Sequence, residues 1–491
     1  MKKRIVIILF AALLLLCACQ PTPDNPIVIG KDQTGMLEQA KKPIPEDRKN
    51  LSIRDRLGAP ERLTYSHHKG NWTIEADAEV VVPDAELPIV RVFPMDFDQQ
   101  TVSGLWTLLV GDVPMEIKLY ERTKDEIASH IQILTAAIDD GRLADYHFAS
   151  REEAEQAIEV LKRQYREAPD VASGDPADGT LLKGAYLDDN GKEASTRTYL
   201  DAESYETGYR FSVTNSGTNR EPVIKKSYDE YGREIGFSTL PVSSGGSFSF
   251  VKGSEPEIVC YIYERELSFS DGCPEEGGKA LTITPKDAKA FAEDFLQKAG
   301  MDGSYRAQRI FLIRDYESTQ YSYRVVCSHL VTGCETLMAG NVIDFDEDDI
   351  YAPTWQLETL LLDVNCNGIY YIRFNCPLAI GDAITEQSNL LPFSEIKAIM
   401  KKMLPIIYRN DSPDENSDII TEMRINRVEL GLWRVRIQDK IDQGMLIPVW
   451  AFYAYKTERD PNGMFDETVS YLPILLINAV DGSIIDPAKG Y

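Results

Sequence analysis

The chain has 491 residues, 43% of them apolar, and a formal net charge of −26 at pH 7. The apolar content is enough for a sizeable core and excludes a disordered chain. The acidic balance excludes a general nucleic-acid binder, whose phosphate contacts require clustered Lys and Arg, and argues equally against a body that lies flat on anionic lipid.

The N-terminal segment has the pattern of a bacterial lipoprotein signal peptide. Basic residues 2–4 precede an apolar run over residues 5–16, and Leu16-Cys17-Ala18-Cys19 forms a lipobox. Because the apolar run is shorter than the roughly 20 residues that span a bilayer, the pattern favours cleavage after Ala18 over a retained membrane anchor. We therefore predict a diacylglyceryl group on the Cys19 thiol, which would hold the protein at the extracytoplasmic face of the cell membrane through lipid alone.

The mature chain is long enough for several domains. Removal of residues 1–18 leaves 473 of the 491 residues, and at about 150 residues per domain we expect about two to four domains. Residues 168–179 are rich in Asp, Pro and Gly, as expected of a linker. The predicted organisation is a signal peptide (1–18), a lipidated cysteine with its tether (19–60), a mixed α/β domain (61–168), a β-rich domain (180–273) and a pair of helix-plus-sheet units (280–491).

The N-terminal half alternates between strand-like and helical patterns. Alternation of apolar and polar residues predicts strands, and apolar spacing of three and four predicts helices. The last of these helices has Ser150 as the N-cap of a capping box with Glu153. Residues 180–273 are rich in Tyr, Thr, Ser and Gly, and turn signals such as Asn190-Gly191 favour antiparallel sheet there. The predicted elements are a short helix at 36–40, strands over 72–82 and 89–93, and helices over 123–138 and 150–165.

Two similar helix-plus-strand units follow. The first helix has Thr284 as its N-cap, Pro285 at its first position and Gly300 just past its end. The second helix has Ser394 at the cap, repeats the apolar offsets of the first, and is expected to bend or stop before Pro405. The predicted strands lie over 306–313 and 321–329 after the first helix, and over 424–437, 446–455 and 471–478 after the second, with an Asp481-Gly482 turn into a last strand. The fold class is therefore α+β, with antiparallel sheets and packed helices.

Six cysteines follow the lipobox, and the sequence does not determine their pairing. They are Cys260, Cys273, Cys327, Cys334, Cys366 and Cys376. A hairpin turn at Asn367-Gly368 would place Cys376 roughly 23 Å along its strand from the position facing Cys366, whereas a disulfide requires Cα atoms within about 7 Å. A turn at Thr332-Gly333 likewise sets Cys334 opposite Val331 and out of reach of Cys327. Cross-strand pairs, free buried thiols and a Cys260–Cys273 bridge remain open.

Few residues point to a reaction. Zincin, phosphate-loop and G-x-S-x-G motifs are absent from the sequence. Cys327 and His329 are two apart, which on a strand places both on one face. A buried thiol beside a hydrogen-bonded His is the favoured interpretation, and a Cys nucleophile with a His base is the alternative. The acidic run 344–349 has Asp349 and Trp355 where an EF-hand requires Gly and Glu, so it is interpreted as a solvated loop.

Two resemblances extend this picture. Residues 448–453 and 475–485, which form a strand, an Asp-Gly turn and a closing strand, resemble the end of PepSY-type modules. Such modules occur in protease propeptides and extracytoplasmic regulators, and the resemblance implies binding through sheet and helix surfaces. Cys19-Gln20-Pro21-Thr22-Pro23 and Leu430-Gly431-Leu432-Trp433-Arg434-Val435, with the closing strands, resemble an uncharacterised lipoprotein family (a domain-of-unknown-function family) of clostridial gut bacteria. This second resemblance implies lipidation of Cys19 and no particular reaction.

The sequence as a whole favours a non-enzymatic, lipid-anchored cell-surface protein that binds a protein or peptide partner, with no cofactor and no metal. Two alternatives stay open: a lipoprotein that binds a ligand or cation for uptake, and a hydrolase with a divergent Cys327/His329 site. The acidic net charge is expected to attract cationic partners and to repel nucleic acid.

Overall fold

The structure of the protein is a computed structural model. It describes residues 32–113, 115–117, 124–139, 151–167, 199–204, 209–215, 223–228, 234–240, 246–252, 261–276, 279–315, 320–337, 357–408, 420–437, 440, 443–459 and 465–486. The lipobox with Cys19, the 168–179 linker, Ser150, Asn190-Gly191, Cys260 and the acidic run 344–349 lie outside these residues. Within them, no helix is both long enough and apolar enough to cross a membrane.

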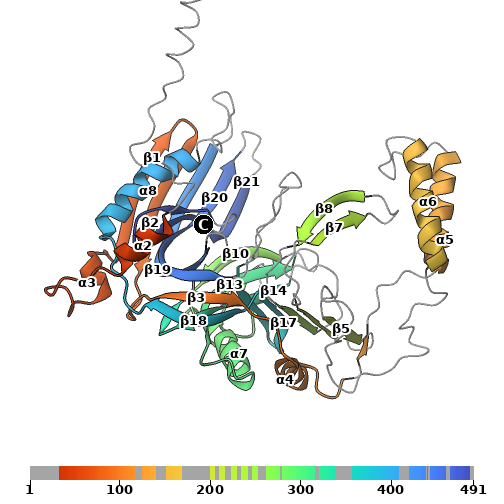
Figure 1. The fold of residues 1–491 in the computed structure, drawn as a ribbon, viewed down its shortest axis with the longest axis horizontal. Helices are drawn as coiled ribbons and strands as arrows, with labels where there is room; N and C mark the ends of the chain where they lie inside the picture. Colours follow the sequence, from red (N-terminus) through yellow and green to blue (C-terminus); the bar gives the residue numbers. More distant parts are fainter. Residues whose placement is uncertain are drawn as a thin grey trace, which may run out of the picture.

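Two large sheets form the body of the protein (Figure 1). Sheet A has the strand order β1-β2-β19-β20-β21-β22, and β3 pairs with both β20 and β18. Its strands are β1 (Arg62–Lys69), β2 (Trp72–Val81), β3 (Ile89–Pro94), β18 (Leu378–Thr385), β19 (Ile420–Arg436), β20 (Gly444–Arg459), β21 (Phe465–Asn478) and β22 (Ile484–Ile485).

Sheet B has the order β10-β13-β14-β16-β17-β9-β6-β5-β4, and β15 pairs with β14. Its strands are β4 (Glu116–Ile117), β5 (Tyr199–Ser204), β6 (Tyr209–Thr214), β9 (Ser247–Lys252), β10 (Tyr261–Leu267), β13 (Tyr305–Asp315), β14 (Tyr321–Val331), β15 (Cys334–Glu335), β16 (Thr359–Asn365) and β17 (Gly368–Asn375). Two further pairs are separate, β7 (Val223–Tyr228) with β8 (Glu234–Leu240) and β11 (Glu275–Glu276) with β12 (Lys279–Ala280). The helices are α2 (Gln33–Ala40), α3 (Ile53–Leu57), α4 (Gln99–Leu109), α5 (Lys124–Asp139), α6 (Arg151–Glu167), α7 (Pro285–Lys298) and α8 (Phe393–Ile407).

Helix α8 covers one face of sheet A because its apolar stripe meets the alternating apolar residues of β2, β19 and β20. Phe393, Ile396 and Met400 are buried there, and the ring centroid of Phe393 lies 4.9 Å from that of Trp450. Burial of each large apolar side chain contributes about 1.5–3 kcal/mol. The short helix α2, which the sequence predicted, packs against the opposite face of the sheet through Met36.

The ends of α8 differ from the prediction. Pro392 occupies the N-cap position without a side-chain hydrogen bond, so Ser394 is not the cap. The helix also continues through Pro405 to Ile407, although proline removes one backbone hydrogen bond. Burial of Leu404 and a hydrogen bond from the Tyr408 hydroxyl to a carbonyl of β21 hold the last turn in place.

Helix α7 begins as predicted and packs against sheet B. The Thr284 hydroxyl accepts a hydrogen bond from the N–H of Asp287, whose carboxylate accepts one in return from the N–H of Thr284. Ala288, Ala292 and Phe295 are buried against the sheet in a core that α4 also joins. The helix was predicted from its periodicity, whereas α4 was not predicted.

The α+β class with antiparallel sheets and packed helices is confirmed, but the sheets do not follow the predicted division of the chain. Strand β2, placed by sequence in a separate domain over 61–168, pairs in parallel with β19 from the 280–491 region. Strands β6, β9 and β10 from the 180–273 region complete sheet B beside β13–β17. Alternating strands show which face is buried, but their periodicity carries no information on the neighbour with which they pair.

The turn predictions were right in one hairpin and shifted by one residue in the other. Thr332 and Gly333 both have positive φ, 51° and 86°, and Val331 faces Cys334 as predicted. In the other hairpin Asn365 faces Gly368, so the turn residues are Cys366 and Asn367 rather than Asn367 and Gly368. The Asn365 side chain accepts the N–H of Asn367 and stabilises this register.

The described cysteines, Cys273, Cys327, Cys334, Cys366 and Cys376, are all free thiols. The two disulfides that strand geometry argued against are therefore not formed.

Helices α5 and α6 confirm two further predictions and form an antiparallel hairpin with a small core of its own (Figure 1). The core contains Ile127, Leu134, Ala154, Ile158 and Leu161, which recur at helical spacing.

Candidate functional site

The structure contains three candidate sites, and the first is the pair Cys327 and His329. Cys327 and His329 lie on β14 opposite Ala307 and Tyr305 of β13, on the same face of sheet B. The His329 Nδ1 lies 3.0 Å from a carboxylate oxygen of Glu358. Glu358 also accepts hydrogen bonds from the Tyr305 hydroxyl at 2.6 Å and from the backbone N–H of Leu378 at 2.8 Å.

This arrangement is suited to holding strands together. Burial raises the pKa of the Cys327 thiol far above its ordinary value, so the sulfur is not a thiolate at neutral pH. No hydrogen bond joins Cys327 to His329, both of which the structure describes. Burial first, and the negative charge of Glu358 second, raise the pKa of Tyr305, so its hydroxyl stays protonated and donates. The favoured interpretation, a buried thiol beside a hydrogen-bonded His, describes the pair.

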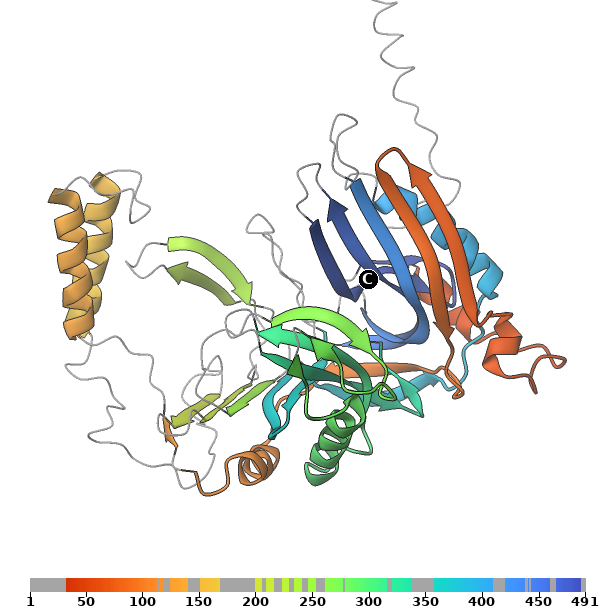
Figure 2. The ribbon, with the colours of Figure 1, turned by 180° about the vertical axis from the view of Figure 1, so that it is seen from behind.

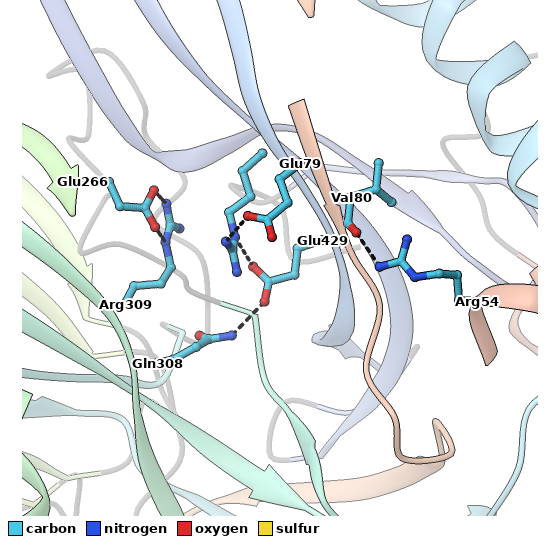
Figure 3. Close-up of polar contacts among 8 residues, drawn as sticks. Arg54, Glu79, Val80, Glu266, Gln308, Arg309 and Glu429 are labelled. Carbon is cyan, nitrogen blue, oxygen red and sulfur yellow. Dashed lines mark hydrogen bonds and ion pairs between the residues drawn. The ribbon is translucent and has the colours of Figure 1, made fainter. Parts of the chain in front are cut away.

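The second group is a charged cluster between the two sheets (Figure 3). Arg309 of β13 forms a bidentate pair with Glu266 of β10, with N–O distances of 2.7 and 2.6 Å. The Arg309 guanidinium also lies 4.5 Å from the ring centroid of Tyr453 in sheet A. The Gln308 side-chain amide donates to Glu429 of β19 across the sheet interface, at 2.8 Å.

The charges of this cluster are matched on both sides of the interface. Arg427 lies 3.0 Å from Glu429 and 3.6 Å from Glu79 of β2. Burial disfavours the charged form of Arg427, but the carboxylate of Glu429 outweighs burial and raises the pKa above its ordinary value. The ion pairs thus lie within one sheet each, and the two sheets are joined here by the Gln308–Glu429 hydrogen bond and by the contact of Arg309 with the Tyr453 ring. In the same view, Arg54 of α3 donates to the carbonyl of Val80 in β2 (Figure 3).

The third group is the edge of sheet A. Strand β1 is the outermost strand, and among the described residues it pairs on one side only, with β2 (Figure 2). The strands are joined by a two-residue turn at Gly70-Asn71, where Gly70 has φ 60° and Lys69 faces Trp72. The register runs without a bulge over all eight residues of β1. The sequence predicted β2, but not β1.

The hairpin geometry determines which backbone groups of β1 face outward. In a two-residue hairpin the closing pair, Lys69 with Trp72, is hydrogen-bonded, and hydrogen-bonded pairs recur at every second residue. The hydrogen bond from the Val80 N–H to the Glu61 carbonyl fits this series, because Glu61, like Lys69, is an odd-numbered residue that bonds to β2. The N–H and C=O groups of the even-numbered residues, Arg62, Thr64, Ser66 and His68, therefore point away from β2.

The two faces of this edge differ in charge. On the face toward α8, Leu63 is buried, Tyr65 is half-buried, and the Lys401 Nζ of α8 lies 6.0 Å from the Tyr65 ring centroid. On the other face Arg62 pairs with Asp77 of β2 at 2.7 Å.

The neighbouring histidines His67 and His68 of β1 point to opposite faces of the sheet. His67 contacts the Trp72 ring at a centroid distance of 5.6 Å, and the His68 Nδ1 lies 2.8 Å from the Thr73 hydroxyl. Neither histidine is therefore placed to share a metal ion with the other. Within the described residues, no group of three or more His, Cys, Asp or Glu side chains is arranged to hold a metal ion.

Comparison with known proteins gives little further information. No protein-family model matches the chain, and no curated protein matches it. One solved structure that matches the chain is the crystal structure of an uncharacterized protein from Eubacterium rectale. It has 12% sequence identity and a TM-score of 0.42, and the match covers 93% of this chain and 99% of that chain.

Proposed function

We propose that this protein is a lipid-anchored extracytoplasmic protein that binds a protein or peptide partner at the β1 edge of sheet A. The observation that carries the proposal is the outward row of backbone N–H and C=O groups on a regular, eight-residue strand. An edge of this kind is a template for an added strand, a recurring mode of peptide recognition. The PepSY resemblance supports the same kind of partner.

The lipobox supports the location. If Cys19 carries the lipid, the 13 residues from it to Asp32, at which the described structure begins, reach at most about 45 Å when fully extended. Sheet A follows closely, because α2 packs on it directly. The β1 edge would thus be presented near the membrane surface, where it can meet surface-exposed or secreted partners.

Metabolic labelling with a fatty acid tests the anchor. Wild-type protein and Cys17→Ala are expected to be labelled and to fractionate with membranes, whereas Cys19→Ala is expected to lose both properties. Cys17→Ala is the matched control because it removes a cysteine of the same lipobox. Undiminished labelling of Cys19→Ala would overturn the anchor.

Site-specific crosslinking on intact cells tests the binding edge. A photo-crosslinking residue at Thr64, whose backbone faces outward on β1, is expected to capture a defined protein that the same residue at exposed Lys286 of α7 does not. Equal capture from both positions would argue against the edge as the site.

A further inference from the structure

We infer that the β1 edge takes an extended acidic segment of its partner, added antiparallel to β1 with its carboxylates on the side of α8. This inference rests on the proposed function and adds the chemistry of the partner.

The first step concerns the backbone. Arg62, Thr64, Ser66 and His68 each direct one N–H and one C=O outward, and an antiparallel neighbour can use all of these groups. The other sheet ends offer less. Strands β22 and β4 have two residues each, β10 lies against β21, and the pairing of edge strand β18 with β3 is interrupted by two register shifts.

The second step concerns charge. The formal net charge of the chain is −26, yet β1 contains Arg62 and Lys69 and no acidic residue. Helix α8 adds basic residues beside it, since Lys401 lies over Tyr65 and Lys397 is one helical turn away on the same side. On the α8 side, Lys69, Lys397 and Lys401 thus form a basic strip on an acidic molecule, to which an acidic segment would be attracted. Arg62 lies on the other face, where it is paired with Asp77.

The third step concerns the orientation of the partner's side chains. On the face away from α8, β2 carries Glu75, Asp77 and Glu79, all exposed. Carboxylates of an added strand would be repelled there and attracted on the α8 face. Since side chains alternate between faces, the preferred segment has acidic residues at every second position and neutral or basic residues between them.

A second copy of the chain fits this edge poorly. Antiparallel pairing of β1 with itself must match even-numbered residues with even-numbered ones, and it offers no carboxylate to Arg62 or Lys69 because β1 has no acidic residue. It would also bring together two molecules that each carry a charge of −26.

Fluorescence polarisation with designed peptides tests the inference. The mature chain is titrated against fluorescein-labelled (Glu-Thr)4, (Gln-Thr)4 and (Lys-Thr)4. The acidic peptide is expected to bind at least about tenfold more tightly than the basic one, and its affinity is expected to fall with added salt. Equal binding of the acidic and basic peptides would overturn the inference.

Two variants separate the backbone from the charge. Ser66→Pro removes an outward N–H, at a position where an edge strand tolerates proline, and is expected to weaken (Glu-Thr)4 about tenfold. Lys401→Glu is expected to weaken it about three- to tenfold, while Lys286→Glu, the same charge change on α7, leaves it unchanged. Melting curves establish that each variant is folded; should Ser66→Pro not fold, protection of the Thr64, Ser66 and His68 amides from hydrogen exchange by the peptide gives the same information.

The outcomes distinguish the two proposals. Unchanged binding in Ser66→Pro and Lys401→Glu, or no amide protection on β1, would refute strand addition of an acidic segment. If crosslinking at Thr64 captures a partner on cells while (Glu-Thr)4 does not bind, the proposed function stands and the acidic chemistry is wrong.

Discussion

The buried pair of Arg309 on β13 and Glu266 on β10 gives the sharpest test of the charged cluster beside the sheet interface. The change is Glu266→Gln, which keeps the side-chain shape and removes the charge. The Arg309 side chain is 2% exposed and that of Glu266 17%, so the substitution removes the negative charge of a bidentate partner from a guanidinium in a desolvated site. Removal of one partner of a buried pair costs about 3–5 kcal/mol, and we expect the lower end because Gln retains one acceptor.

Urea denaturation followed by tryptophan fluorescence measures the loss. The matched control is Asp294→Asn on α7. Asp294 pairs with Lys298, and because their side chains are 54% and 57% exposed, this ion pair is expected to contribute less than about 1 kcal/mol to stability. The double variant Glu266→Gln/Arg309→Met is expected to cost less than the sum of the single changes, because it leaves no buried charge unpaired. A Glu266→Gln protein as stable as Asp294→Asn would refute the reasoning.

The same pair predicts a dependence on pH. Burial raises the pKa of Glu266, but attraction to Arg309 and its hydrogen bonds lower that pKa by more, so the net value lies below the ordinary 4.5. A carboxyl whose pKa is lowered on folding stabilises the folded state above the unfolded value and loses that effect as the pH falls. The difference in the free energy of unfolding between wild type and Glu266→Gln is therefore expected to be largest at neutral pH and to shrink below pH 4.5.

Three further predictions concern other parts of the molecule. A fragment of residues 280–491 lacks β1–β3, which bury apolar side chains against α8, and is expected to be digested rapidly by protease unless residues 61–94 are supplied with it; a cooperative melt of the fragment alone would contradict the sheet assignment. Exposed Cys366 is expected to react with iodoacetamide in the native protein and buried Cys327 only after denaturation, as peptide mass spectrometry would show. Gly431→Ala would place a Cβ 2.8 Å from the Leu337 side chain where the two sheets meet, and we expect a loss of about 1–3 kcal/mol in the urea experiment, whereas an unchanged midpoint would show that the interface adapts.

Local patterns predicted several elements correctly. The N-cap at Thr284, the periodicity of α5 and α6, and the Thr332-Gly333 turn depend on neighbours within a few residues, and the structure has all of them. A prediction that depended on a single residue was less successful. Pro405 did not end α8, because burial of the helix against sheet A outweighs one missing hydrogen bond.

The binding edge shows which part of a site a sequence can reveal. Residues 62–69 are mostly polar and carry two adjacent histidines, so their periodicity is weak, although the Gly70-Asn71 turn beside them could have indicated a hairpin. Their basic character was visible, but it was averaged into a net charge of −26. Only the fold shows that β1 is an edge strand and that α8 places Lys401 beside it.

The sequence by itself determined the α+β class and the elements whose stability is local, because spacing, caps and turns are encoded within a few consecutive residues. The tertiary structure alone decided that β2 and β3 join strands more than 300 residues away in sheet A, that Gln308 donates a hydrogen bond to Glu429 across the two sheets, and that His329 faces Glu358. Distant strands pair in the arrangement that buries the apolar faces of all strands together. That arrangement is a property of the whole chain rather than of any segment.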